Sequence, residues 1–375
     1  MSEEKHWTRR NVLRTSGVIA GVSAMAGCIG DTGNGGNNGN GNGTGSGGSP
    51  GSLSMPPVGA VEFDDVPETW VANNGSWADM GIALGHKPPK ALYMPSRYHT
   101  HYYDEIPGVS VDGSKIDALY ESGVDKEKFY EYDADVHVID PNFLQNRFQG
   151  WEESDIEDVE QIAPFFGNSI FSRGYPWHED YTYLSLYEAF EKLSQLFQEP
   201  ERYAAFDELH DEFQSSIEDI VPPDGERPTV AVLWANGDGT FLPYLIDEGT
   251  SFKQWRDLGV RDALAETDVV DFHSSRGSIG YETLLEIDPD VILCRGYEGS
   301  SKQEFQNAIV TPMKNDNAGS QLTAVQTDDV YRGGPLYQGP ITNLVVTQRA
   351  AEQVYGIDEQ LYDPQTVSNI VNGDQ

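Results

Sequence analysis

The sequence has little cysteine and little positive charge. Only two cysteines occur in 375 residues, which excludes a scaffold held together by disulfides. One of them, Cys294, lies in the apolar run VILC, which predicts a buried thiol. Lys and Arg together number 24 against 61 Asp and Glu, which gives a formal net charge of −37. Because such a field repels phosphate backbones, we expect no nucleic acid partner.

The short motifs of common enzyme classes are also missing. The sequence contains no G-x-S-x-G elbow, no P-loop and no H-E-x-x-H motif. Acidic pairs occur all along the chain, so no pair of carboxylates stands out as catalytic. We therefore predict no catalytic residue and expect a protein that is not an enzyme.

The acidic residues indicate a folded protein in a salty environment. Many form DE, ED and EE pairs among apolar positions, as on the solvated faces of folded elements, and Lys is scarcer than Arg. At very high salt, ionic screening removes most of the self-repulsion of such a chain. We therefore expect the protein of a halophile.

The first 27 residues have the features of an export signal. Arg9 and Arg10 precede a short apolar run that ends before Cys28. A twin-arginine pair before such a run predicts twin-arginine export, and the run is far shorter than the roughly 20 residues that span a bilayer. Small residues before Cys28 resemble a lipoprotein signal, with a plain cleaved signal as the alternative. We expect a lipidated Cys28 on the extracellular face of the membrane.

The rest of the chain predicts an α/β architecture. A Gly- and Asn-rich tether precedes alternating strand-like and helix-like segments, which favour parallel sheets. From about residue 181 helical spacing persists for about forty residues, and then the alternation resumes. We expect two three-layer α/β lobes with mainly parallel sheets, joined by one long backbone helix. The expected divisions are signal 1–27, tether 28–56, N-terminal lobe 57–178, helical connector 179–223 and C-terminal lobe 224–375.

Two segments of the first lobe are predicted to be helical. The stretch ETWVANNGSWADMGIALG begins at Glu68, has apolar residues at helical spacing and stops at Gly85. The shorter stretch IDALYES begins at Ile116.

One phrase occurs twice in the chain. KEKFYEYDADVHVI begins at Lys126, and YETLLEIDPDVILC begins at Tyr281, 155 residues later. Each copy predicts a helix that leads into a strand, at corresponding places in the two lobes. The matched pairs are Glu127 and Glu282, Glu131 and Glu286, Asp133 and Asp288, Asp135 and Asp290, and Val136 and Val291.

These features together resemble the substrate-binding proteins of ABC importers, in the branch that binds iron–siderophore complexes, cobalamin and haem. Members of that branch carry S-x-E-x-ϕ-x-x-ϕ-x-P-D-ϕ-ϕ (ϕ apolar) in each lobe. The second copy here reads GYETLLEIDPDVIL, whereas the first has Ala134 where proline is usual. QIAPFF from Gln161 and QLTAVQTDDVYRGG from Gln321 also resemble segments of the family.

The resemblance implies a class III periplasmic-binding-protein fold with the ligand in the cleft between the lobes. It implies a monomer that delivers this ligand to an ABC permease dimer with its ATPase and touches the membrane only through its lipid anchor. It further implies that Glu127 and Glu282 each dock onto one permease subunit, and a carboxylate in a first helical turn is favoured by the helix dipole. No cofactor is expected beyond the Fe(III) or Co that a ligand carries.

The loops that follow the expected strands pair arginine with aromatic residues. Guanidinium groups suit carboxylate, hydroxamate or phosphate oxygens, and aromatic faces suit a large flat ligand. We therefore expect a metal chelate, with a ferric siderophore favoured and cobalamin or haem as alternatives. The expected cleft residues are Arg97, Tyr98, His99, His101, Tyr102, Tyr103, Arg173, Tyr175, Trp177, Trp234, Phe241, Arg276, Arg295, Tyr297 and Tyr337.

The pair His99 and His101 raises the question of a metal. Alternating histidines can chelate, and tyrosines supply hard oxygen ligands for Fe(III). A set completed by His273 and Asp238 has unconvincing spacing, so we predict no metal site of the protein itself. Contact with a chelated metal, including axial ligation to haem or cobalamin, stays open. An anchored extracellular enzyme with a site near these histidines and a ligand sensor are the alternative functions.

Overall fold

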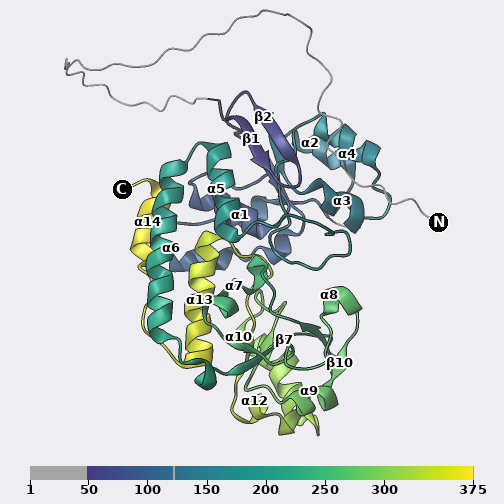
Figure 1. Cartoon of the computed structure of the whole chain (residues 1–375), viewed down its shortest axis with the longest axis vertical. Coiled ribbons are helices and arrows are strands. Elements are labelled where there is room, and N and C mark those ends of the chain that lie inside the picture. The colour runs from purple at the N-terminus through teal and green to yellow at the C-terminus, as the bar shows by residue number, and fades with distance from the viewer. Residues whose placement is uncertain (1–48, 121–122, 375) are drawn as a thin grey trace, which may run out of the picture. The chain divides into compact units, whose positions relative to one another are not determined.

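The structure is a computed structural model that describes residues 49–120 and 123–374 (Figure 1). The predictions for Arg9, Arg10 and Cys28 lie outside the described residues, as does the expected tether up to residue 48. Within the described ranges, every helix is too short or too polar to span a bilayer.

In the described part of the chain, the first two strands form a hairpin that starts inside the segment expected as a tether. Strand β1 (Gly51–Met55) pairs antiparallel with β2 (Gly59–Phe63) and buries Met55 and Phe63 against the first lobe. The alternation of exposed and inward side chains along both strands is that of a half-buried hairpin.

A parallel sheet of four short strands forms the centre of the first lobe. Its order is β5-β4-β3-β6, and all of its pairings are parallel. The residues of β3, β4 and β6 are buried, as expected when helices cover both faces of a parallel sheet. The strands are β3 (Trp70–Ala72), β4 (Ala91–Leu92), β5 (Asp117–Ala118) and β6 (Val136–Val138).

The helix predictions for the stretches from Glu68 and from Ile116 need correction. The stretch from Glu68 divides into β3 and helix α1 (Gly75–Ala83), because the Asn74 side chain accepts a hydrogen bond from Ser76 N at 2.9 Å and caps the helix there. The stretch IDALYES contains β5, because its backbone pairs with β4. Tertiary pairing therefore overrides local helical spacing at the sheet edge.

Helices and 3₁₀ turns connect these strands. They are η1 (Pro95–Arg97), η2 (Thr100–Glu105), η3 (Gly113–Lys115), α2 (Lys126–Tyr132), α3 (Pro141–Arg147) and α4 (Glu153–Glu160).

A layer of long helices follows the first lobe (Figure 1). The longest, α6, has 21 residues, which at 1.5 Å per residue spans about 31 Å. Its buried residues Phe206, Leu209, Phe213 and Ile217 recur at helical spacing. Helix α14 packs on α6, while α13 packs on both α1 and α7 (Lys253–Asp257). The helices are α5 (Leu186–Phe197), α6 (Pro200–Ile220), α13 (Pro340–Tyr355) and α14 (Pro364–Asn372).

The second lobe has a longer-stranded sheet. Its order is β10-β8-β7-β11-β12, with β9 also paired to β7. The pairings among β9, β7, β11 and β12 are parallel, whereas β8 and β10 are antiparallel. Cys294 in this sheet is fully buried, which confirms the prediction. The strands are β7 (Thr229–Ala235), β8 (Thr240–Tyr244), β9 (Arg261–Asp262), β10 (Ile279–Gly280), β11 (Val291–Cys294) and β12 (Val330–Arg332).

Short helices and turns cover this second sheet. The 3₁₀ turns are η4 (Asp224–Glu226), η5 (Thr250–Phe252) and η7 (Gly319–Gln321), and η6 (Gln306–Val310) is a π-helical turn. The α-helices are α7 (Lys253–Asp257), α8 (Phe272–Ser275), α9 (Tyr281–Ile287), α10 (Lys302–Phe305), α11 (Thr311–Asn315) and α12 (Thr323–Gln326).

The repeated phrase forms the same local structure twice. Helices α2 and α9 start and end at positions 155 residues apart, and each leads into a parallel strand, β6 or β11. Both end on an aspartate with left-handed backbone, Asp133 with φ 42° and Asp288 with φ 44°. The predicted helix-to-strand unit is therefore confirmed in both lobes.

The matched aspartates that follow have the same role in both copies. Asp135 Oδ2 accepts hydrogen bonds from Thr69 N at 2.7 Å and Thr69 Oγ1 at 2.9 Å. Asp290 Oδ2 accepts them from Thr229 N at 2.8 Å and Thr229 Oγ1 at 2.7 Å. Each carboxylate thus ties the start of one strand, β6 or β11, to the start of its parallel neighbour, β3 or β7.

Candidate ligand-binding site

Residues from both lobes line one cavity of about 170 Å³. Seven of them lie at or within five residues beyond the ends of β4, β6, β7, β11 and β12, where open α/β sheets bind ligands: Tyr93, Arg97, Phe143, Trp234, Arg295, Leu336 and Tyr337. The lining residues are Tyr93, Arg97, Phe143, Arg147, Phe171, Ser172, Tyr175, Trp234, Tyr244, Ser251, Phe272, His273, Arg276, Arg295, Leu336 and Tyr337.

The cavity is rich in positive charge and aromatic surface. Four of its lining residues are arginines and eight are Phe, Tyr or Trp, while none of these sixteen described residues is Asp or Glu. The cavity lining is thus positively charged, whereas the whole chain carries a formal net charge of −37. The site therefore favours an anion with an extended or flat body.

Arg295 is the most unusual of the four arginines. It directly follows β11 and is 2% exposed, and its guanidinium lies over the rings of Tyr244 and Phe252 at 4.8 and 4.5 Å. Its Nη1 has no hydrogen-bond partner within the described ranges. Burial lowers the pKa of Arg295. A buried cation without a carboxylate partner is costly, so a ligand anion is the natural group to complete the site.

The other arginines approach from the rim. Arg147 ends α3 and Arg276 follows α8, and both are exposed. Arg276 has a left-handed backbone with φ 55°, and its guanidinium lies 5.2 Å from the centre of the Phe272 ring. Arg97 lies near Tyr337, whose pKa is raised by burial while Arg97 opposes the rise. The Tyr337 hydroxyl therefore stays protonated and can donate to a ligand oxygen.

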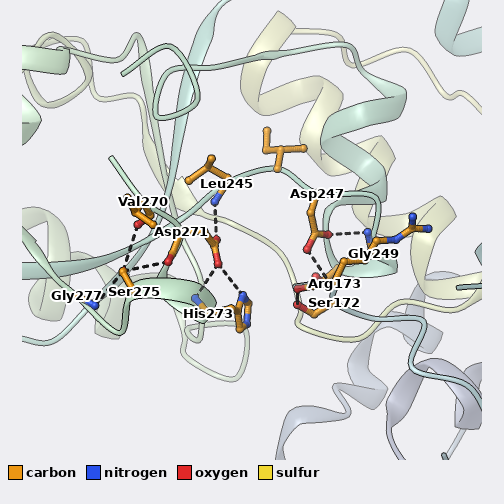
Figure 2. Close-up of polar contacts among 12 residues, drawn as sticks. Ser172, Arg173, Leu245, Asp247, Gly249, Val270, Asp271, His273, Ser275 and Gly277 are labelled. Carbon is orange, nitrogen blue, oxygen red and sulfur yellow. Dashed lines mark hydrogen bonds and ion pairs between the residues drawn. The ribbon is translucent and has the colours of Figure 1, made fainter. Parts of the chain in front are cut away.

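Polar contacts fix the rim where the lobes meet (Figure 2). In the second lobe, Asp271 Oδ1 accepts from His273 N at 2.7 Å and pairs with His273 Nδ1 at 3.1 Å. Because a carboxylate only accepts, Nδ1 carries a proton and Nε2 remains for other contacts. Across the lobes, Asp247 Oδ2 accepts from Arg173 N at 3.1 Å.

The expected cleft residues divide into two groups. Six of them line the cavity: Arg97, Tyr175, Trp234, Arg276, Arg295 and Tyr337. The other nine are not among its lining residues: Tyr98, His99, His101, Tyr102, Tyr103, Arg173, Trp177, Phe241 and Tyr297.

Three tyrosines of the second group are buried in hydrogen-bond networks. The Tyr103 hydroxyl donates to Asp79 Oδ1 at 2.6 Å and lies 2.5 Å from the Tyr98 hydroxyl. Burial raises the pKa of Asp79 to about 6, against the lowering effect of the Tyr103 hydrogen bond. Tyr102 donates to Glu298 of the second lobe. These hydroxyls hold protein together rather than face the cavity.

His99 and His101 lie beside Tyr102. Burial lowers the pKa of His99 to about 4 and also lowers that of His101, so both rings are neutral at pH 7. Among residues 49–120 and 123–374, no three His, Cys, Asp or Glu residues are grouped so as to hold a metal ion.

The remaining residues of this group lie outside the cavity lining and contact other parts of the protein. Trp177 stacks on Tyr175 with ring centres 4.4 Å apart, and Arg173 lies over the Tyr183 ring at 4.6 Å. Phe241 packs in the core of the second lobe, 2% exposed. The Tyr297 hydroxyl donates to Ala235 O at 3.4 Å.

Ten lining residues are not among the expected cleft residues. Arg147 could have been predicted from the sequence, because its helix directly follows β6 along the chain. Tyr244 could not have been, because it ends an antiparallel strand, to which the rule for parallel strand ends does not apply. The ten are Tyr93, Phe143, Arg147, Phe171, Ser172, Tyr244, Ser251, Phe272, His273 and Leu336.

The two glutamates expected to dock lie away from this cavity. Glu127 is the second residue of α2, Glu282 is the second residue of α9, and both are exposed.

Comparison with known proteins identifies the family. A model described as periplasmic binding protein matches residues 124–336, more than half of the chain. None of the curated proteins matches the sequence. The chain therefore belongs to the periplasmic binding protein family and is a substrate-binding protein rather than an enzyme.

Solved structures share the fold at low sequence identity. A periplasmic binding protein from Veillonella parvula matches with TM-score 0.58 and 15% identity, over 84% of this chain and 100% of that one. The triscatecholate siderophore binding protein FeuA from Bacillus subtilis, complexed with ferri-bacillibactin, matches with TM-score 0.56, 16% identity and coverages of 82% and 99%. An ABC-type Fe³⁺-hydroxamate transport system from Saccharomonospora viridis matches with TM-score 0.54, 18% identity and coverages of 81% and 98%. The expected two-lobed α/β fold is confirmed.

Proposed function

We propose that this substrate-binding protein captures an anionic metal chelate outside the cell and delivers it to an ABC importer, and that the chelate is a ferric siderophore. The observation that carries the proposal is Arg295, a buried guanidinium with an unpartnered Nη1 in a cavity without acidic lining residues. The protein itself needs no catalytic group for this task, because ATP hydrolysis belongs to the importer.

The charge of the cavity supports an anionic ligand over a neutral or cationic one. Four guanidiniums converge in a partly desolvated space, where the attraction to an anion is stronger than in bulk water. A neutral ligand could offer Nη1 of Arg295 a hydrogen bond but no opposite charge, and so would recover less of the cost of burying this cation. Catecholate and carboxylate chelates of Fe(III) meet this demand better than neutral hydroxamate complexes.

The size of the cavity implies that the site opens for its ligand. About 170 Å³ is less than the roughly 300–1,000 Å³ of pockets for drug-sized ligands. A siderophore is at least of that size, so side chains or lobes have to move. Arg147 and Arg276 are exposed at the rim, so moving their side chains outward would expose little buried surface.

The relatives leave the choice of chelate open. The two iron-related structures bind or transport, by their descriptions, a triscatecholate complex and a hydroxamate complex on the same fold. The selection among chelates therefore rests on side chains of this chain. Cobalamin and haem are the alternative ligands.

Docking and anchoring complete the proposal. Glu127 and Glu282 meet arginines of the two permease subunits, which is supported by their exposure at matched positions 155 residues apart. Twin-arginine export through Arg9 and Arg10 and lipidation at Cys28 hold the protein at the extracellular face of the membrane of a halophile. The chain acts as a monomer, with the lobes and connector divided as expected from the sequence.

The test is a ligand titration of the purified chain in molar salt, followed by tryptophan fluorescence, since Trp234 lines the cavity. The probes are a ferric triscatecholate, ferric citrate, a neutral ferric trihydroxamate, haem and cyanocobalamin. We expect the anionic ferric chelates to bind. We expect Arg295→Ala to weaken that binding about 100-fold, because truncating one partner of a buried charge pair costs 2–5 kcal/mol or more.

The matched control is Arg261→Ala, because Arg261 is an exposed arginine of the same lobe that pairs with Glu266. It should leave affinity unchanged. Binding of haem or cyanocobalamin alone would replace the siderophore as ligand, and binding of none of the five probes would refute the proposed function.

A further inference from the structure

We propose that Tyr102, Glu298 and Arg349 form a buried clasp that holds two cavity arginines, Arg97 and Arg295, at a fixed separation. The clasp thereby selects chelates whose anionic groups match that separation. This inference rests on the proposed function, since it concerns how the same cavity discriminates among ligands.

The clasp is centred on the carboxylate of Glu298. Its side chain is 1% exposed, and Oε2 accepts from the Tyr102 hydroxyl and from Arg349 Nη1, the latter at 2.9 Å. Oε1 accepts from Gly334 N at 3.1 Å. Burial by itself raises the pKa of Glu298, but Arg349 and Tyr102 hold that pKa below its usual range, so the carboxylate is ionised. Both oxygens are therefore satisfied in a place where water has little access.

The clasp joins the two loops that carry the arginines. In the second lobe, Arg295 and Glu298 lie three residues apart in the loop after β11. In the first lobe, Arg97 ends η1 and Tyr102 lies in η2, five residues later. The hydrogen bond from Tyr102 to Glu298 thus crosses between lobes and connects one arginine-bearing loop to the other.

The second-lobe loop is closely packed between Arg295 and Glu298. Gly296 has φ +87°, a conformation that favours glycine. A Cβ at this position would come within 2.6 Å of the Trp234 ring, which itself lines the cavity. This close packing of Gly296 on Trp234 provides a contact path from Glu298 to Arg295 and the cavity wall.

The first-lobe loop is anchored on helix α13, the helix whose Arg349 binds Glu298. Tyr103, next to Tyr102, donates to Asp79, and Asp79 Oδ2 accepts from Ile341 N at 2.9 Å in the first turn of α13. Arg349, which binds Glu298, lies further along α13. Helix α13 therefore supports both loops, and the hydrogen bond from Tyr102 to Glu298 adds the direct link between them.

The alternative is that the clasp merely holds the lobes together. The two ideas differ in what happens when a cavity arginine is absent. A contact that acts by positioning Arg295 loses its effect on affinity once Arg295 is removed, because energies couple only between residues that act together. A contact that acts on general stability lowers affinity equally in both backgrounds.

The test uses the full chain with a ferric triscatecholate as probe, in molar salt. Tyr102→Phe removes only the hydroxyl, and we expect about tenfold weaker binding, which corresponds to the loss of one buried hydrogen bond to a charged group. In the Arg295→Ala background the same change should alter affinity less than twofold. The matched control is Tyr355→Phe, which removes a tyrosine hydroxyl that donates to Leu258 O at 2.5 Å and lies outside the cavity lining.

A second variant keeps the test decisive if Tyr102→Phe does not fold, as judged by circular dichroism. Glu298→Gln retains the shape and removes the charge, and the same cycle with Arg295→Ala applies to it. Equal effects with and without Arg295, or no effect beyond that of Tyr355→Phe, would overturn the clasp as a positioning device. Failure of the unmodified chain to bind any ferric chelate would instead refute the proposed function, so the two failures are distinguishable.

Discussion

The two lobes carry the same repeated phrase on different sheets. In the central sheet of the first lobe the strands have two or three residues and all pair in parallel. In the second lobe β7 has seven residues, and two antiparallel strands extend the sheet. The shared phrase nevertheless forms the same helix, the same left-handed aspartate and the same carboxylate tie in both. A local unit of this kind therefore tolerates large differences in the sheet around it.

The lobes also differ in their titratable side chains. Burial lowers the pKa of five first-lobe histidines, whereas His273 is the one histidine in the described second lobe. The second lobe instead buries the cation Arg295. The first lobe is thus the acid-sensitive half, while the second supplies the buried charge of the cavity. The five are His86, His99, His101, His137 and His178.

The largest expected effect concerns the element that both lobes share. Replacing Glu127 and Glu282 together by Ala should reduce uptake by intact cells to background while ligand affinity stays unchanged, because each glutamate lies on an exposed helix start remote from the cavity. Each single change should have a smaller effect. The control is the pair Glu131 and Glu286, exposed on the same helices one turn later. Reduced ligand affinity in the double variant would place these glutamates at the ligand site instead.

Tight glycines allow a direct comparison of the two sheets. A Cβ on Gly167 would lie 2.5 Å from the backbone of Ile139 after β6, whereas one on Gly333 would lie 2.9 Å from the backbone of Leu293 in β11. Backbone atoms cannot move aside, so we expect Gly167→Ala to lower the free energy of unfolding by about 3 kcal/mol and Gly333→Ala by less. Chemical denaturation measures both. Gly225→Ala, with nothing within 4 Å, is the control. A larger loss at Gly333 would reverse the ranking.

A single exchange should remove part of the acid sensitivity of the first lobe. His137 is fully buried, and 155 residues later the second copy has Ile292. Burial lowers the pKa of His137 from 6.5 to about 4, so its contribution to stability is present above pH 6.5 and is lost as pH falls through 4. We expect His137→Ile to gain about 3 kcal/mol relative to the unmodified chain between pH 7.5 and pH 4.

Denaturation at both pH values measures this gain. Hydrogen exchange in β6 and β11 then shows where it arises, with β11 as the internal control. The same pH dependence with and without His137 would show that other groups control the acid sensitivity.

The smallest expected effect tests the equivalence of the repeated ties. Asp135→Ala and Asp290→Ala each remove the acceptor for a threonine N–H and hydroxyl at the start of a neighbouring strand. Each should lower the free energy of unfolding by about 1 kcal/mol, because solvent can partly replace these bonds. Thermal unfolding of the two variants should give similar shifts. Clearly unequal losses would show that the two ties differ in strength.

Part of the candidate site followed from strand ends alone. Arg97, Arg295 and Tyr337 lie just after β4, β11 and β12, where an alternating α/β pattern directs attention. The run from Tyr98 to Tyr103 also follows β4, but none of its residues lines the cavity. Its three tyrosines turn inward, because each hydroxyl finds a partner in the molecule. Sequence pattern cannot distinguish a loop tyrosine that faces a ligand from one that faces a buried carboxylate.

The sequence by itself determined the alternation of elements, the helix-to-strand repeat and the surplus of arginine and aromatic residues in loops, because these depend on neighbours within a few positions. Only the tertiary structure decided which arginine is buried with an unpartnered Nη1. It also decided which glutamate accepts the hydrogen bond of the Tyr102 hydroxyl, since Tyr102 and Glu298 are 196 residues apart in the chain. Burial and charge pairing depend on all atoms packed around a group, and those come from both lobes. For that reason the acidic average of the chain did not reveal a cavity of the opposite sign.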